Sequence, residues 1–185
     1  MIGNDVIQSD SPRRPRPLTM PLRVALLLLG LHSLTADALP SDRDKPIQIQ
    51  ADWAELDERK GTATYGGDVR MSQGTMQVRA ERLVIYTERD KVLKILADGS
   101  ATAPARYEQQ PREDQPVLQA SAQHIIYVTA EQRIELRGNA RLSQRNNQFM
   151  GGVIEYSIAR ELVTASSGQS SGGRVTVTFD PNQRR

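Results

Sequence analysis

Few side chains in this 185-residue sequence are suited to catalysis. His124 is the one histidine after residue 38, and Ser121 is a nearby candidate nucleophile. On a single β-strand, residues three positions apart point to opposite faces, so the two side chains would not meet. Without a second histidine or any cysteine in this region, we expect neither a histidine-rich metal site nor thiolate chemistry. We therefore interpret His124 as a surface residue.

An acidic cluster is the second group of residues with catalytic side chains, and it consists of Asp52, Glu55, Asp57 and Glu58. Two such carboxylates could form the acid-and-base pair of a glycoside hydrolase, and the adjacent Trp53 could stack on a sugar. A solvated turn near the first strand explains the acidic residues more simply, and Trp53 is explained by packing at the rim of the fold. A carbohydrate-active enzyme stays as an alternative. We predict that the protein is not an enzyme and needs no metal or cofactor.

The charge pattern is mixed along the chain. The formal net charge is +2, and acidic and basic residues are interleaved, as in the segment 88–91. Proteins that bind nucleic acid combine a basic patch with aromatic stacking partners. The sequence has no such combination, so we expect no nucleic-acid partner. The absence of cysteine also means that no disulfide stabilises the fold.

The N-terminal region has the pattern of an export signal. A basic segment with Arg23 precedes the apolar run 24–31, and a small-x-small site ends at Ala38. The run is shorter than the about 20 residues that a membrane-spanning helix needs. We predict a signal peptide over 1–38, with cleavage between Ala38 and Leu39, and treat the Pro- and Arg-rich residues 1–19 as an extension preceding a start at Met20. A retained segment would instead make the protein a membrane-anchored scaffold.

After residue 38 the dominant pattern is an alternation with a period of two. Ile47 and Ile49 alternate with Gln48 and Gln50, and the same alternation recurs over 69–71, 76–80, 134–136 and 175–179. Such alternation is typical of strands with one wet face. The segments 52–60 and 159–165 have some helical character but are too short for a packed helix. The sequence therefore predicts an all-β fold.

One motif occurs twice. The segment 67–73 (GDVRMSQ) reappears at 138–144 (GNARLSQ), seventy-one residues later, and 49–51 (IQA) corresponds to 118–120 (LQA). Repetition of a unit that cannot bury its own apolar face is typical of stacked or rolled β architectures. We expect one domain over 39–180 built from two copies of a several-strand module. A long loop at 108–116, a flexible linker at 166–173 and a disordered tail at 181–185 complete the prediction.

These segments resemble the OstA-like domain family of lipopolysaccharide-transport proteins. The resemblance rests on KPIQIQAD at 45–52 followed by Leu56-Asp57, TYGGDVRMSQGTM at 64–76, PARY at 104–107, GNARLSQ at 138–144 and RVTV at 174–177. It implies an open, rolled antiparallel β-jellyroll of two facing sheets with an apolar interior, located in the periplasm. It also implies lipopolysaccharide as ligand, inner-membrane and outer-membrane transport proteins of the same fold as partners, and head-to-tail self-association.

The resemblance implies that inward-facing side chains form a groove for the acyl chains of lipopolysaccharide. Burial of a methylene group is worth about 0.8 kcal/mol, so a chain of roughly a dozen carbons costs about 10 kcal/mol to expose to water. Each inward side chain alone is also explained as an ordinary core residue, so the assignment belongs to the set as a whole. The predicted groove residues are Ile47, Ile49, Val69, Met71, Met76, Val78, Ile95, Tyr107, Ile125, Tyr127, Ile134, Leu136 and Leu142.

An unclosed roll also leaves strand edges that can pair with other chains. One predicted assembly edge is the first strand, with Pro46, Ile47, Gln48, Ile49 and Gln50. The other is a late strand, around either Val153 and Tyr156 or Val175 and Val177, and the sequence leaves this choice open. Capped edges and a monomeric protein are the alternative. Arg70, Arg79 and Arg141 fall on the polar face, where we interpret them as solvated charges.

Overall fold

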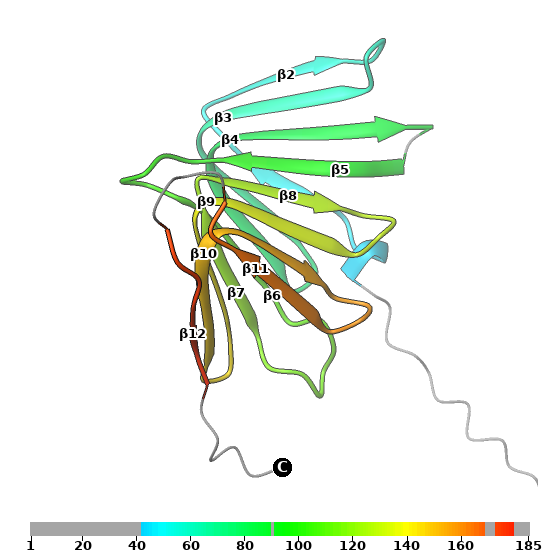
Figure 1. The fold of residues 1–185 in the computed structure, drawn as a ribbon. Helices are drawn as coiled ribbons and strands as arrows, with labels where there is room; N and C mark the ends of the chain where they lie inside the picture. The colour runs from blue at the N-terminus through cyan, green and yellow to red at the C-terminus, as the bar shows by residue number, and fades with distance from the viewer. Residues whose placement is uncertain (1–41, 90, 169–172, 180–185) are drawn as a thin grey trace, which may run out of the picture. The chain divides into compact units, whose positions relative to one another are not determined.

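The computed structural model describes residues 42–89, 91–168 and 173–179 (Figure 1). The contacts divide the chain into residues 1–38 and Leu39–Arg185, and every described residue lies in the second unit. The predicted signal peptide over 1–38, its cleavage between Ala38 and Leu39, and the tail at 181–185 therefore lie outside the described residues.

The described part is all-β, as the alternation predicts. It contains one short 3₁₀ turn and strands that pair antiparallel throughout, without an α-helix in the described ranges. The elements are η1 (Asp42–Asp44), β1 (Gln48–Gln50), β2 (Trp53–Asp57), β3 (Thr62–Gln73), β4 (Met76–Glu88), β5 (Lys91–Asp98), β6 (Ala105–Gln109), β7 (Leu118–Ala122), β8 (His124–Val128), β9 (Arg133–Gln144), β10 (Asn147–Ser157), β11 (Leu162–Ser166) and β12 (Thr176–Thr178).

Four long strands, β3, β4, β9 and β10, run through two sheets. One half of each belongs to a first sheet with the order β1-β3-β4-β6-β7-β9-β10-β12. The other half belongs to a second sheet with the order β2-β3-β4-β5-β8-β9-β10-β11. In Figure 1 the strands of the second sheet run across the view, whereas β6, β7 and β12 of the first run downward.

Glycines of the duplicated motif mark the positions where two of these strands bend. Gly67 in β3 and Gly138 in β9 have φ values of +78° and +79°, which L-residues rarely adopt. A Cβ atom at Gly67 would lie 2.1 Å from Oδ2 of Asp52, and one at Gly138 would lie 2.2 Å from Oε1 of Gln123. The pairing of β3 with β4 shifts register at the same place, as expected of a β-bulge.

The pairing of β7–β12 parallels that of β1–β6. Strands β1 and β2 both pair with β3, as β7 and β8 both pair with β9. Strand β4 in turn pairs with β5 and β6, as β10 pairs with β11 and β12. The second occurrence of the motif therefore occupies the same place in the pairing pattern as the first.

The middle of the fold is closed, while its two ends are not. Strands β4-β5-β8-β9-β7-β6 form a complete circuit that returns to β4, which differs from the fully open roll that the resemblance implies. The closure arises because the long strands β4 and β9 each pair with different neighbours in their two halves. Outside this circuit, β1 and β2 pair only with β3, and β11 and β12 pair only with β10, so each pair leaves an edge free within the described residues.

The structure corrects several sequence-based predictions. Strand β10 is flanked on both sides, so Val153 and Tyr156 do not lie on an edge, and the late edge comprises β11 and β12. The acidic segment expected to be a turn includes strand β2. The loop predicted at 108–116 begins only after Gln109, whereas 159–165 forms a turn and most of β11, in agreement with the rejection of a helix there.

Candidate functional site

The inward face of the first sheet is a continuous apolar row. Strand registers place its members directly opposite one another, from one free edge to the other. In order from β1 to β12, they are Ile49, Met71, Val78, Tyr107, Ala120, Leu142, Phe149 and Val177.

The second sheet contributes two further inward rows to the same interior. From β3 to β11, the first comprises Tyr65, Leu83, Ala97, Ile125, Leu136, Ile154 and Ala165. The second comprises Ala63, Ile85, Ile95, Tyr127, Ile134, Tyr156 and Val163. Their members pack with those of the first sheet in one hydrophobic cluster.

The structure places all thirteen predicted groove residues in or against this cluster. Eleven of them, from Val69 to Leu142 in the sequence, are buried, with exposed fractions of 6% or less. The other two, Ile47 and Ile49, are half-buried near the free edge. The middle of the interior is thus packed with protein side chains, and partly accessible positions lie toward the ends of the rows.

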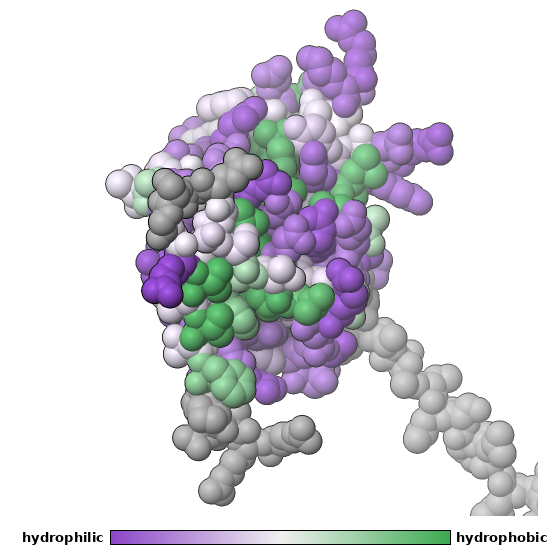
Figure 2. All heavy atoms as spheres, viewed as in Figure 1, coloured by the Kyte–Doolittle hydropathy of each residue, from purple (hydrophilic) through white to green (hydrophobic). Residues whose placement is uncertain are grey.

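At the late edge the apolar interior reaches the solvent. Val177 on β12 pairs with Phe149 on β10 and has 53% of its surface exposed, and the adjacent Phe179 has 69% exposed. Figure 2 shows hydrophobic residues gathered over β10–β12 on the face toward the viewer. At the opposite edge Leu56 of β2, which pairs with the inward Ala63, is also largely exposed. An apolar ligand can therefore contact the interior rows at either end without displacing the packed centre.

A polar network joins η1 to the interior of the first sheet. The carboxylate of Asp42 accepts hydrogen bonds from the backbone N–H and the hydroxyl of Thr75, at 2.7 and 2.6 Å. Gln109 donates another to Asp42 and accepts one from the hydroxyl of buried Tyr107. Tyr107 in turn packs against Tyr127, with ring centroids 6.2 Å apart. Burial raises the pKa of both tyrosines, so they are neutral phenols at physiological pH.

The residues first considered for catalysis do not converge. Ser121 is on β7 and His124 on β8, so they occupy different strands, contrary to the single strand assumed from the sequence. Nδ1 of His124 lies 2.9 Å from Oδ1 of Asp98, at the surface. His124 and Asp98 both face outward from the second sheet, and no hydroxyl group among the described residues is hydrogen-bonded to the histidine.

The acidic cluster lies on and beside β2. Asp57 is paired with Lys60, whose hydrogen bonds lower the pKa of the Asp57 carboxyl. Across the described ranges, no group of three or more histidine, cysteine or acidic side chains is placed to hold a metal ion. Trp53, about half exposed, packs over Gly66, where a Cβ atom would lie 2.4 Å from its indole ring. The tryptophan thus covers a bend in β3.

Several interior residues lie outside the set predicted from the sequence. Phe149 and Val163 line the late end of the rows, while Leu83 and Ile154 are completely buried. Tyr156, predicted as an edge residue, is an interior residue. The short alternation at 162–165 was an available signal for β11.

Together these features define a class: an all-β protein whose two sheets enclose an apolar interior that reaches solvent at both free edges. Among the described residues, no helix has the length and apolar character needed to cross a bilayer.

Comparison with known proteins identifies the family. Residues 48–162 match the model of the LptA/(LptD N-terminal domain) LPS transport protein family. The chain is 37% identical over 158 residues to the lipopolysaccharide export system protein LptH of Pseudomonas aeruginosa, covering 85% of this chain and 87% of that protein. It is 31% identical over 166 residues to LptA of Escherichia coli K12, covering 90% and 87%. The chain therefore belongs to the LptA/(LptD N-terminal domain) LPS transport protein family.

A solved structure agrees with this assignment. The crystal structure of LptH from P. aeruginosa, described as the LptA-homologous periplasmic component of the lipopolysaccharide transport device, superimposes with a TM-score of 0.69 at 33% sequence identity. The match covers 77% of this chain and all of the solved chain. Family and fold thus agree with the all-β class that the alternation predicted.

Proposed function

We propose that this protein binds lipopolysaccharide in the periplasm and carries it between the inner and the outer membrane. The observation that supports this function best is the set of inward apolar rows, which extend from one free edge to the other. Its relatives are named lipopolysaccharide export proteins, and the solved LptH is described as periplasmic. In this proposal the protein is a binding protein and not an enzyme.

The physical role of the interior is to replace the bilayer for the acyl chains. Each methylene group transferred from water to an apolar surface gains about 0.8 kcal/mol. A ligand that moves along an apolar row keeps this gain at every step, so its movement needs no large input of free energy. The protein would act as a conduit, and the energy for directional transport would come from elsewhere.

Ligand entry would begin at the ends of the rows. The central residues are already buried against one another, so an acyl chain would first contact the half-buried Ile49 or the pair Phe149 and Val177. Deeper entry would require the two sheets to separate. The rolled, two-module arrangement suits this role, because the pairing of β7–β12 parallels that of β1–β6 and gives two equivalent halves around one interior.

The free edges would join copies of the protein head to tail. Strands β1 and β2 offer one unpaired edge and β11 and β12 the other, and exposed edges are templates for pairing with another chain. Transport proteins of the same fold at the two membranes would pair with the terminal copies in the same way. Apolar rows of successive copies would then align at each junction.

Photocrosslinking with matched neighbouring positions tests the interior site. A photoreactive residue replaces inward Ile49 or Val163, and the controls are the outward Gln50 and Thr164 on the same strands. We expect capture of lipopolysaccharide in cells at the inward positions and little at the outward ones. Equal capture at both kinds of position would overturn the proposal of an interior site.

The mature N-terminus tests the form in which the protein acts. Intact mass of the protein from cells should correspond to a chain that begins at Leu39. A mass that retains residues up to Ala38 would favour the second candidate, a membrane-anchored scaffold of the same fold.

A further inference from the structure

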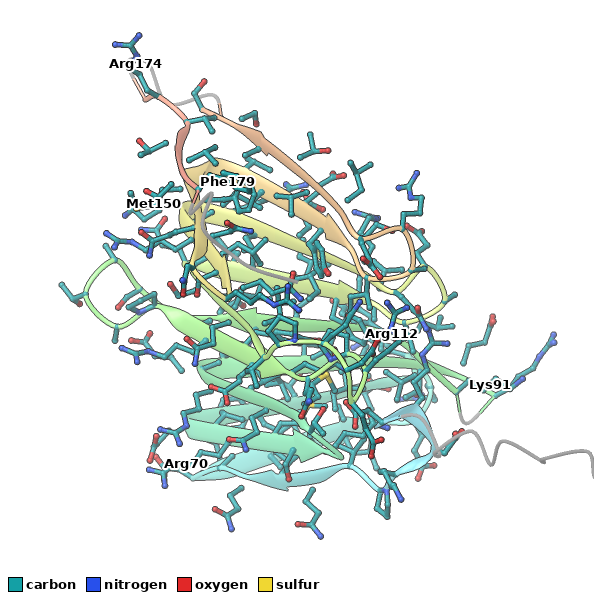
Figure 3. The ribbon with its side chains drawn as sticks, turned by 90° about the horizontal axis from the view of Figure 1, so that it is seen from below. Arg70, Lys91, Arg112, Met150, Arg174 and Phe179 are labelled. Atoms are coloured by element: carbon teal, nitrogen blue, oxygen red, sulfur yellow. The ribbon has the colours of Figure 1, made fainter. Side chains whose placement is uncertain are left out.

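A row of arginines crosses the outward face of the first sheet. Arg70 on β3 lies directly opposite Arg79 on β4, and Arg79 lies opposite Arg106 on β6. The row continues through Ser121 on β7 to Arg141 on β9. Figure 3 shows Arg70 and Met150, the residue opposite Arg141, on the same side of the molecule. Like charges directly opposite one another destabilise a sheet, so this row has a cost that folding alone does not explain.

Arginines on the outward face of the second sheet are arranged differently. A carboxylate lies within ion-pair distance of each of them. Arg82 is near Asp98, Arg133 lies 2.7 Å from Glu131, and Arg137 lies 2.5 Å from Glu135. In the first sheet Arg70 pairs with Asp68. By contrast, Arg79, Arg106 and Arg141 form no ion pair with any other residue that the structure describes. Three guanidinium groups of one row therefore have no carboxylate within ion-pair distance among the described residues.

These three arginines surround a hollow in the surface. It has a volume of about 320 Å³ and is lined by Arg79, Arg106 and Arg141 together with the intervening Ser121. Because Ser121 is small, it leaves a gap between Arg106 and Arg141, whose strands are two sheet spacings, or roughly 10 Å, apart. Two arginine side chains can reach one anion across such a gap. Further hydrogen-bonding groups around the hollow come from Gln77, Gln119, Ser143 and Gln148.

We propose that this outward hollow binds a phosphate group carried by a saccharide. Guanidinium groups match the geometry of phosphate oxygens and form paired, charge-assisted hydrogen bonds with them. The amide and hydroxyl side chains around the arginines suit sugar hydroxyls, and the volume is at the small end of the range for ligand sites. The arginine and amide side chains of this site point to the face opposite the apolar interior, while Tyr107, Ala120 and Leu142 of the inward row also border the hollow.

One carboxylate, that of Glu108, also lines the hollow. Glu108 pairs with Gln77 across the strands and accepts a 3.2 Å hydrogen bond from the side chain of Gln119. It opposes an anionic ligand but is outnumbered by the three guanidinium groups. Removal of this negative charge by Glu108→Gln should therefore strengthen binding of an anion, whereas removal of an arginine should weaken it.

The test is calorimetric titration of the purified protein at fixed ionic strength with a deacylated, bisphosphorylated glucosamine disaccharide. This probe has no acyl chains, so the result is independent of the proposed function of the interior. We expect Arg106→Gln and Arg141→Gln to weaken binding at least ten-fold and Glu108→Gln to tighten it several-fold. The matched control Arg137→Gln, on the outward face of the second sheet, should bind like the unaltered protein.

Two further titrations identify the source of the phosphate. Inorganic phosphate bound as tightly as the disaccharide would indicate a site for the free anion, and tighter binding of the disaccharide would indicate a head group; both results support a phosphate site. Binding of a dephosphorylated disaccharide with equal affinity would overturn the proposal. So would the absence of binding to every probe, or an equal loss in Arg106→Gln and Arg137→Gln. Thermal unfolding checks the variants, and Arg106→Gln should be at least as stable as the unaltered protein because it removes like-charge repulsion.

Discussion

The side-chain amide of Gln109 donates a 2.7 Å hydrogen bond to Oδ2 of Asp42, so β6 holds the N-terminal turn η1 against the first sheet. Gln109 is itself buried and linked to the hydroxyl of Tyr107, an inward residue at the centre of the apolar row. The turn is thereby connected to the packed interior. A small number of polar contacts thus hold the turn against the interior at this position.

Asp42→Ala should weaken this restraint. Two donors, the backbone N–H of Thr75 and the side-chain amide of Gln109, lose their acceptor, while the Thr75 hydroxyl can still donate to the carbonyl of Gln110. We expect a loss of about 1–3 kcal/mol in the free energy of unfolding, mainly through buried Gln109. Urea unfolding measures this loss, and increased binding of an apolar dye would show easier access to the interior. The control Asp114→Ala removes only a 3.6 Å ion pair with exposed Arg112 and should have little effect. Equal losses in both variants would contradict the role of Asp42.

The two motif glycines should tolerate substitution poorly. Gly67→Ala and Gly138→Ala each place a Cβ atom on a positive-φ backbone and close to a neighbouring side chain. We expect a loss of about 1–3 kcal/mol at each position, measured by urea unfolding. Asparagine adopts this backbone region more readily than alanine, so Gly138→Asn should lose less. A Gly138→Asn variant less stable than Gly138→Ala would argue against backbone strain as the cause.

Stability should fall at alkaline pH. Burial raises the pKa of Tyr107, Tyr127 and Tyr156 in the folded protein, most strongly for Tyr107. In the unfolded chain a tyrosine ionises near its ordinary pKa of about 10. Above that pH the unfolded state binds fewer protons than the folded state, so the free energy of unfolding decreases as the pH rises toward the folded-state pKa values. Below about pH 10 the tyrosines are protonated in both states, and this loss of stability does not occur.

Unfolding free energies measured on both sides of about pH 10 test this dependence. Tyr107→Phe should cost about 1 kcal/mol at neutral pH through the lost hydrogen bond to Gln109, and its alkaline slope should be shallower. An unchanged slope in Tyr107→Phe would show that this tyrosine does not contribute to the pH dependence.

Engineered cysteines can test the proposed head-to-tail pairing, because the natural sequence has no cysteine. Gln48→Cys on β1 and Thr178→Cys on β12 place thiols on opposite free edges. If copies pair through these edges, mild oxidation of the double variant should give a ladder of disulfide-linked oligomers on a non-reducing gel. A control that combines Thr178→Cys with Gln119→Cys, on the flanked strand β7, should give no such ladder. A ladder of equal length in both double variants would reflect random collision.

The alternation in the sequence predicted which side chains point inward, because inward and outward positions follow one another along a strand. It identified pairs such as Met71 and Val78, which face one another across β3 and β4. It failed for β2, where the inward Ala54 and Leu56 lie among Trp53, Glu55 and Asp57, which resemble a solvated turn. The alternation also did not predict burial on the outward face. Val84 points outward, between the inward Leu83 and Ile85, and is nevertheless buried.

Edge positions could not be derived from local pattern. Val153 and Tyr156 have the alternation of any strand with one wet face, and their place in the sheet depends on two later segments that pair with β10. The hollow lined by arginines could not be predicted from the sequence either. Arg79, Arg106 and Arg141 are distant in the sequence, and only the strand registers show that they share one row.

The four long strands that pass through both sheets also govern how the molecule fluctuates. Because β4 and β9 lie in the closed circuit and in both sheets, we expect their central amide hydrogens to exchange with solvent mainly through unfolding of the whole domain. Amides of β1, β2, β11 and β12 have a neighbour on one side only, and local fraying exposes them at a much smaller cost in free energy. We therefore expect these edge strands to open and reclose many times within the lifetime of a single folded molecule.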